Sequence, residues 1–349
     1  MANDEKVKEA LQWYDKNKKL YEKCAENEKD IIEKILMNRE IPYHSITYRV
    51  KDRESYRHKC ENEKYTNPID EIMDLAGIRI IAYTNKDVQK ICDIIKQEFE
   101  IDVQNSMDKH NVMNDNQVGY LSVHFITKLK ENRTTLAEYK IYTGIQSEIQ
   151  VRTLLQHTWA EIEHDRNYKF SGVLPKEIRR QFYVLAGVLE LVDKEFDLLS
   201  EQIDSYERET EQKVTQGDYN IVITSESLKR YLLNKFDKSD YIKPCINGEI
   251  ITNDVIEELL DFGFNTIKDI DDNITSDFLN MENTYIGLLR DIMICKDSQK
   301  YFEEVFHGQW GGTSTESVEL WKTHGANSIE RYLQEYGINV YNEEESVDF

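Results

Sequence analysis

Between Pro42 and about residue 168, short β-rich runs alternate with stretches of helical periodicity, and this alternation constrains the fold more than any other feature of the sequence. The β-rich runs are Tyr43 to Val50, Gly77 to Tyr83, Ile101 to Ser106, Leu121 to Leu129 and Ser147 to Arg152. The helical stretches are Arg53 to Tyr65, Lys86 to Phe99 and Thr153 to Tyr168. This pattern predicts an α/β (α+β) domain with a mixed β-sheet flanked by helices.

Two long helices are expected to frame this core of residues 42–168. From Asn3 to about Met37, apolar side chains recur every three or four residues among many charges, which is typical of an amphipathic helix that packs across a sheet. A second helix is predicted from Pro175, a favourable first-turn residue, to about Val214. We expect it to close the first domain with an apolar stripe that includes Phe182, Leu185, Leu189, Leu191, Val192, Phe196, Leu199 and Ile203.

With 349 residues, the chain is longer than one hydrophobic core usually serves, so two domains are expected. The predicted domains are 1–214, with an N-terminal helix at 3–37 and a closing helix at 175–214, and 218–349. The second domain is predicted to be mainly helical, with helices that end at Gly263 and Gly337. Its Trp310 and Trp321 are expected to be exposed, so this domain could bind a protein partner or a second copy of the chain.

The formal net charge of −22 argues against a general nucleic-acid binder, which would need a dense field of Lys and Arg. From Asp218 to the C-terminus there are 26 acidic and 11 basic residues, a net charge of −15, so phosphate chemistry is expected in the first half. The sequence has no apolar run long enough to cross a membrane and begins with a charged segment. With five scattered cysteines and no C-x-x-C pair, it is expected to be cytoplasmic.

Two segments before the middle of the domain carry charge at the ends of predicted strands. Arg49 and Lys51 share one strand face and could clamp a polyphosphate, with the arginine also able to stack on a base, although a solvated charged surface would give the same pattern. Asp74 in DLAGIRI stands just before a buried strand that also carries Arg79. Mg²⁺ with nucleotide phosphates would compensate this acid, but a turn cap and an Asp74–Arg79 pair would explain the two residues equally well.

Two further segments place polar side chains on one face of a strand. In GYLSVHF, the alternation puts Tyr120, Ser122 and His124 on one face, which suits a nucleotide pocket with the tyrosine stacked on a base. In SEIQVRT, Glu148, Gln150 and Arg152 alternate with Ile149 and Val151. Glu148 could complete a Mg²⁺ site with Asp74, while a cross-strand ladder of salt bridges is the structural alternative.

Taken in order, these four segments resemble the RelA/SpoT synthetase family over about residues 48–164. The family shows R-x-K before a helix, then D-[IL]-A-G-[IV]-R, G-Y-x-S-x-H and E-[IV]-Q-[IV]-R-T; here they stand as YRVKDRESYRHK, DLAGIRI, GYLSVHF and EIQVRT. The resemblance implies a nucleotidyltransferase-like fold and an enzyme similar to a small alarmone synthetase. Such an enzyme transfers the β,γ-pyrophosphate of ATP to the 3′-hydroxyl of GDP or GTP. A hydrolase domain ahead of the synthetase is not expected.

On the ATP side, the resemblance implies that Arg49 stacks on adenine and that Lys51, Lys59 and Arg79 hold the phosphates. It further implies that Asp74 and Glu148 bind Mg²⁺. Glu148 would also accept the proton of the attacking 3′-hydroxyl. Positioning and charge neutralisation, which phosphoryl transfer mainly requires, would thus come from cations and one metal ion.

On the acceptor side, the resemblance implies that Tyr120 stacks on the guanine and that His124 supports phosphate or ribose. We also place Gln150 and Arg152 in this acceptor-binding set, and Lys109 lies at a spacing that fits a loop lysine of the family. The family often has Pro-Lys and then Asn before G-Y, whereas this chain has NDNQV. A basic contact to the 5′-phosphates of the acceptor is therefore missing, and the choice between GDP, GTP and another acceptor stays open.

Three alternatives remain at this point. Some short relatives pyrophosphorylate the 3′ end of tRNA or make an adenine alarmone, although the acidic balance of this chain disfavours tRNA. A nucleotide-sensing or partner-binding module without turnover is a rival of another class, and intact Asp74 and Glu148 argue against it. His157, Glu161 and His164 share one helix face and could hold a metal ion, but no fourth ligand is evident.

Overall fold

The computed structural model describes residues 2–108, 122–169, 175–237, 239–245 and 248–342. The chain divides into two compact units, Met1–Ser200 and Glu201–Phe349. The division falls within α8 (Lys176–Gln216), a single helix of 41 residues. The domain limits given above, 1–214 and 218–349, stay a prediction.

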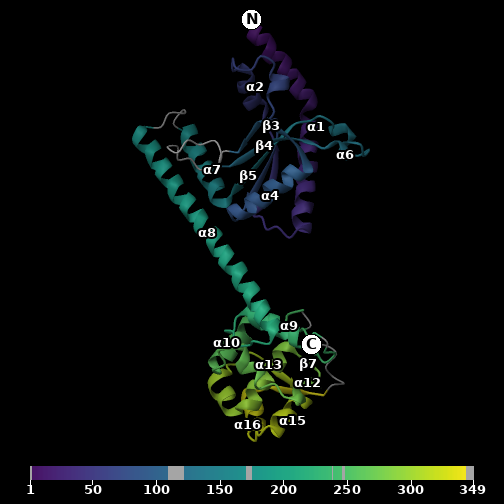
Figure 1. The fold of residues 1–349 in the computed structure, drawn as a ribbon, viewed down its shortest axis with the longest axis vertical. Helices are drawn as coiled ribbons and strands as arrows, with labels where there is room; N and C mark the ends of the chain where they lie inside the picture. The colour runs from purple at the N-terminus through teal and green to yellow at the C-terminus, as the bar shows by residue number, and fades with distance from the viewer. Residues whose placement is uncertain (1, 109–121, 170–174, 238, 246–247, 343–349) are drawn as a thin grey trace. The chain divides into compact units, whose positions relative to one another are not determined.

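The first unit is built on a five-stranded mixed sheet (Figure 1). The strands lie in the order β1-β2-β5-β4-β3, and only β2 and β5 are parallel neighbours. Their bounds are β1 Ser45–Val50, β2 Ala76–Ala82, β3 Phe99–Asp108, β4 Val123–Leu129 and β5 Ser147–Thr153. The predicted mixed sheet is confirmed.

Helices α1 (Ala2–Asn38) and α4 (Asn85–Glu98) cover one face of this sheet. Alternate strand residues such as Ile78, Ile80 and Ile149 pack with the apolar side chains of both helices in one core. The opposite strand face is polar, as expected when only one face is buried in the core. The remaining elements of this unit are α2 (Arg53–Glu61), α3 (Pro68–Glu71), α6 (Glu131–Thr134), a 3₁₀ turn (Lys140–Tyr142) and α7 (Leu154–Lys169).

Helix α2 begins directly after β1 because Asp52 caps it. The Asp52 Oδ1 atom accepts hydrogen bonds from the backbone N–H groups of Glu54 and Ser55, at 3.1 and 2.9 Å. Such a cap satisfies amides that have no partner inside the helix. It fixes the turn from β1 into α2, so that residues at the end of β1 and on α2 can meet at the same edge of the sheet.

The helix α8 does not close the first domain along its whole length, which corrects our expectation for its apolar stripe. Ala186 and Asp193 are buried, and Thr153 Oγ1 donates to Asp193 Oδ2 at 2.8 Å. By contrast Leu191 is 60% exposed, and several other stripe residues are exposed as well: Leu185, Phe196, Leu199 and Ile203. The reason is length, because 41 residues of helix span about 60 Å whereas a seven-residue strand spans about 23 Å.

The second unit is mainly helical, as predicted, and has its own apolar core. Two short parallel strand pairs, β6–β7 and β8–β9, were not predicted. Its elements are α9 (Ser225–Lys235), β6 (Ile242–Lys243), α10 (Asn253–Asp261), α11 (Ile267–Asp271), α12 (Ser276–Leu279), β7 (Asn283–Thr284), α13 (Tyr285–Lys296), α14 (Ser298–Lys300), a π-helical turn (Tyr301–Val305), β8 (Gly312–Ser314), α15 (Thr315–Thr323), α16 (Ile329–Tyr336) and β9 (Asn339–Tyr341).

Four single-residue expectations for this unit can be compared with the structure. Gly263 and Gly337 have positive φ angles, 94° and 67°, just after α10 and at the end of α16, so the two helix ends are confirmed. The expected exposure of the two tryptophans is wrong. Trp310 is partly buried and packs against the core of this unit. The side chain of Trp321 is only 1% exposed, and its Nε1 donates to Asp291 Oδ1 at 2.8 Å. The Gly and Ser residues nearby in the sequence suggested an exposed segment, although Trp321 lies in the core.

Among the described helices, none combines the length and the apolar character that a membrane crossing requires.

Candidate active site

The register of the sheet places the polar residues of three strands in rows across its polar face. Arg49 of β1 lies opposite Gly77 of β2, which lies opposite Glu148 of β5. Residues in one row project to the same side of a sheet. Since Gly77 has no side chain, the side chains of Arg49 and Glu148 face each other across it.

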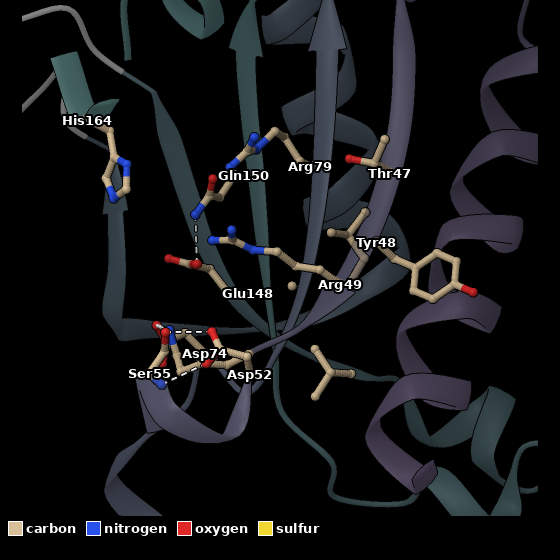
Figure 2. A pocket seen from close by; sticks show the side chains of 14 residues that line it. Thr47, Tyr48, Arg49, Asp52, Ser55, Asp74, Arg79, Glu148, Gln150 and His164 are labelled. Atoms are coloured by element: carbon tan, nitrogen blue, oxygen red, sulfur yellow. Dashed lines mark hydrogen bonds and ion pairs between the residues drawn. The ribbon is translucent and has the colours of Figure 1, made fainter. Parts of the chain in front are cut away.

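The next row brings together a second set of polar residues. Thr47, Arg79, Gln150 and His124 are successive partners on β1, β2, β5 and β4. In Figure 2 the side chains of Arg49, Arg79, Glu148 and Gln150 converge on the same space, with Asp74 and Asp52 below them. The alternation predicted from EIQVRT is therefore present, with Ile149 and Val151 buried on the other face.

These side chains surround a cavity of about 490 Å³. It has three cationic lining residues and three carboxylates, together with His164 from α7 at one side (Figure 2). The lining residues are Thr47, Tyr48, Arg49, Val50, Lys51, Asp52, Ser55, Asp74, Gly77, Ile78, Arg79, Glu148, Gln150 and His164. Side chains of both charges thus line a space that is large enough for part of a nucleotide.

Asp74, which precedes β2, is held by two lysines. Its Oδ2 atom accepts from Lys59 Nζ at 2.6 Å and lies 3.0 Å from Lys51 Nζ. Burial alone would raise the pKa of Asp74, but the hydrogen bonds and charges of Lys59 and Lys51 outweigh burial and hold this pKa below its ordinary value. The alternative in which Asp74 pairs with Arg79 does not occur, because Arg79 Nη1 instead donates to Glu161 Oε1 on α7 at 2.8 Å.

The other carboxylate oxygen of Asp74, Oδ1, is buried and has no hydrogen-bond partner among the residues that the structure describes. A buried carboxylate oxygen without a partner is energetically unfavourable. This oxygen is therefore available to a ligand that binds carboxylates.

Both oxygens of Glu148 accept hydrogen bonds from neighbouring side chains. His124 Nδ1 lies 2.9 Å from Oε1, and Gln150 Nε2 donates to Oε2 at 2.8 Å. Burial would raise the pKa of Glu148, but the hydrogen bond and charge of His124 and the hydrogen bond of Gln150 hold it below its ordinary value, against the opposing charge of Asp74. The carboxylate is thus ionised and fixed in orientation.

Arg152 is the most buried cation of the site, with 6% of its surface exposed. Burial, and then the nearby charge of Arg79, lower its pKa to about 10. Its Nη2 donates to Gln150 Oε1 at 2.6 Å, while its Nε has no partner within the described part of the chain. A buried guanidinium that is only partly satisfied must have a role that offsets its desolvation.

The structure brings together most of the residues that the sequence predicted. Lys59, His124 and Arg152 contact the residues of the cavity wall, and six others line it: Arg49, Lys51, Asp74, Arg79, Glu148 and Gln150. Lys109 and Tyr120 lie outside the described residues. The roles assigned to all of these residues stay predictions. For His157, Glu161 and His164, the described residues show no metal-binding group, and Glu161 serves as the partner of Arg79.

Sequence reasoning did not single out Asp52 and Ser55, and it did not place His164 at this cavity. Asp52 and Ser55 reach the cavity because the cap at the start of α2 lies at its edge, and the order R-x-K-D was the available signal. His164 reaches it because α7 follows β5 directly and passes beside the polar face. The sequence marked that histidine only as a member of a helix face with His157 and Glu161, and the packing of α7 is what places it at the cavity.

A mixed sheet with helices over one face, and with cations and paired carboxylates around a cavity on the other, defines an α/β protein with a polar site suited to an anionic ligand. Residues 48–173 match the family described as the region found in RelA / SpoT proteins. This part of the chain, residues 48–173, is thus a RelA/SpoT-type domain, as the four motifs indicated.

Two curated relatives are both from Bacillus subtilis (strain 168). The GTP pyrophosphokinase YwaC is 28% identical over 133 residues, which are 38% of this chain and 60% of that protein. The GTP pyrophosphokinase YjbM is 28% identical over 155 residues, which are 44% of this chain and 70% of that protein. The chain thus spans about 60% of the length of the first of these relatives.

Among solved structures, the small alarmone synthetase 1 from Bacillus subtilis is 23% identical, with a TM-score of 0.47. The similarity covers 56% of this chain and 98% of that one.

Proposed function

We propose that this chain is an ATP-dependent pyrophosphotransferase that moves the β,γ-pyrophosphate of ATP to the 3′-hydroxyl of GDP or GTP. The observation that carries the proposal is the meeting of Asp74 and Glu148, 74 residues apart in sequence, in the wall of one cavity with Arg49, Lys51 and Arg79. The match of residues 48–173 to the region found in RelA / SpoT proteins supports it, and both curated relatives are named GTP pyrophosphokinase.

The residues present fit a magnesium ion. Carboxylate oxygens are the protein ligands that Mg²⁺ prefers, and Asp74 Oδ1 is buried without a partner among the described residues. Asp74 and Glu148 would hold the ion, which would neutralise charge on the polyphosphate when bound. Glu148 keeps free lone pairs, because each carboxylate oxygen has two and the structure shows one hydrogen bond to each.

The cations of the cavity would hold ATP. An ammonium group has three N–H donors, so Lys51 and Lys59 can keep Asp74 and also bind phosphate oxygens. Arg79 would exchange Glu161, which is about half-exposed, for a phosphate. Arg49, at the end of β1, would stack on the adenine.

The reaction requires one proton acceptor and a fixed geometry. The 3′-hydroxyl oxygen of the acceptor forms a bond to the β-phosphorus of ATP, and the bond from that phosphorus to the α,β-bridging oxygen breaks, which releases AMP. Glu148 takes the proton of the hydroxyl group, and its lowered pKa keeps it ionised before the reaction. Tyr120 and Lys109 would complete the acceptor side, with His124 at the edge of the cavity.

The test is a transfer assay with purified protein, Mg²⁺ and ATP labelled at the γ-phosphate. GDP, GTP, AMP and deacylated tRNA are offered separately, and we expect label in a guanine nucleotide. The variant Glu148→Gln should lose at least about 100-fold in kcat because it cannot accept the proton, while its affinity for ATP changes little.

A matched control is Glu131→Gln on α6, an exposed glutamate away from the cavity, which should keep full activity. If tRNA or AMP is labelled instead, the proposed pyrophosphate transfer stands and only the proposed acceptor is wrong. If no acceptor is labelled while ATP still binds, the chain is a nucleotide-binding module without turnover and the proposal fails.

A further inference from the structure

Five side chains form one continuous hydrogen-bonded chain across β4 and β5. Arg152 Nη2 donates to Gln150 Oε1 at 2.6 Å, and Gln150 Nε2 donates to Glu148 Oε2 at 2.8 Å. On the other side of the carboxylate, His124 Nδ1 lies 2.9 Å from Glu148 Oε1, and Ser122 Oγ lies 2.6 Å from His124 Nε2. The carboxylate that we propose as the base is therefore held from both sides.

The direction of this chain is fixed by its chemistry. A guanidinium can only donate and an ionised carboxylate can only accept. The Gln150 amide between them must therefore turn its oxygen to Arg152 and its NH₂ group to Glu148. By the same reasoning, His124 must carry a hydrogen on Nδ1.

We propose that Gln150 and Arg152 are positioning residues for Glu148 and do not bind the acceptor. This inference rests on the proposed function, and it revises the acceptor-binding role that the sequence suggested for both residues. Gln150 reaches the cavity wall, but its polar atoms already contact Glu148 and Arg152. Arg152 is 6% exposed and is not among the described residues that line the cavity.

The burial of Arg152 gives an independent reason for this role. A guanidinium that is buried beside Arg79, with a neutral amide as its hydrogen-bond acceptor, is an expensive group to keep in a sheet. Without a donor at this position, the Gln150 amide could rotate and turn its oxygen towards Glu148, which would repel the carboxylate. Arg152 prevents that rotation, so its effect reaches the cavity through Gln150.

The inference is tested first by steady-state kinetics of Arg152→Met and Gln150→Leu with GTP, GDP and GMP as acceptors. A misplaced base should lower kcat by about 10- to 100-fold for every acceptor that turns over, with the KM values for ATP and acceptor within about 3-fold of the parent. Arg152→Lys, which still only donates, should restore most of kcat. Gln89→Leu, the same change on the exposed side of α4, is the matched control.

The opposite kinetic result is equally clear. If Arg152 or Gln150 held the acceptor, the variants would have a higher KM for the acceptor while kcat stayed high. The loss of acceptor affinity would then grow from GMP to GTP with the number of phosphates.

The double variant gives a further criterion. Residues that act along one path should give a double variant about as impaired as the worse single one, and additive losses would contradict the proposal.

A measurement without turnover separates this inference from the proposed function. With selective ¹⁵N-glutamine labelling, the side-chain amide protons of Gln150 should exchange slowly with water in the parent and in Arg152→Lys, and fast in Arg152→Met. Near-ultraviolet circular dichroism checks that each variant is folded, and Gln150→Leu, at a half-buried position, provides a second variant for the kinetic test should Arg152→Met not fold. Exchange that does not depend on residue 152 would overturn the inference, whether or not the protein transfers pyrophosphate.

Discussion

Glu28 is a single residue whose chemistry is set by burial rather than by a partner. It lies on α1 with 0% of its surface exposed, next to Cys24 and Ser147. Burial raises its pKa to about 8, although the neighbouring Ser147 and Cys24 side chains lower it in part. Neither carboxyl oxygen has a hydrogen-bond partner of good geometry among the described residues. The group is therefore an uncharged acid in the folded protein at neutral pH.

This residue predicts how stability depends on pH. The folded state keeps the proton up to about pH 8, whereas the unfolded chain loses it near its ordinary pKa of 4.5. The free energy of unfolding should thus fall as pH rises between these two values, by up to about 1.4 kcal/mol per pH unit. Glu28→Gln should remove this slope, as measured by urea unfolding at pH 5, 6, 7 and 8. A slope that stays the same in the variant would show that Glu28 is not its source.

At the scale of the element, Gly77 is the residue of strand β2 that leaves space for the cavity. This glycine separates Arg49 from Glu148, and a Cβ atom there would lie 3.9 Å from Arg49 Cγ, an ordinary contact. Space for one carbon atom is therefore available, but larger side chains would extend between the arginine and the carboxylate. The glycine keeps the cavity open and is not required by the backbone.

We therefore predict different outcomes for two substitutions at this position. Gly77→Ala should fold, with stability equal to the parent or up to about 1 kcal/mol higher because glycine is unfavourable within a strand. Gly77→Val should also fold, since β-branched residues suit strands, but should weaken ATP binding by about 10-fold or more. Thermal unfolding and titration calorimetry measure the two effects. Tight ATP binding by Gly77→Val would place the nucleotide elsewhere.

At the scale of the whole molecule, the two units have separate cores and separate buried charges. In the second unit, Glu258 is buried and pairs with Arg290, whose Nη2 lies 2.6 Å from Oε1. Tyr301 donates a further hydrogen bond to Glu258 Oε2 at 2.6 Å. Removing one partner of such a pair leaves a buried charge uncompensated.

This arrangement predicts that the units unfold as separate cooperative transitions. Arg290→Met should destabilise the second unit by about 3–5 kcal/mol and leave the transition of the first unit unchanged. Differential scanning calorimetry with and without ATP identifies the units, because ATP should raise the transition of the first unit alone. A single transition that moves as a whole in the variant would mean that the units unfold together.

The amino-acid sequence by itself determined which residues form strands and which of them share a face. It placed Arg49, Glu148 and Gln150 on polar faces because strand side chains alternate, a local property that needs no knowledge of the rest of the chain. Four motifs in order also gave the resemblance to the RelA/SpoT family that the match over residues 48–173 supports. What the sequence could not give is the order β1-β2-β5-β4-β3, since pairing between distant strands depends on global packing.

The tertiary structure alone decided the partners of the site residues. Lys59 and Lys51 meet at Asp74, and Arg79 turns to Glu161, because strand order and the packing of α2 and α7 bring them within reach. It also decided that much of the apolar stripe of α8 is exposed and that Trp321 is buried. Local patterns show which side chains are apolar or charged, but what lies opposite a side chain is settled only when distant segments pack together.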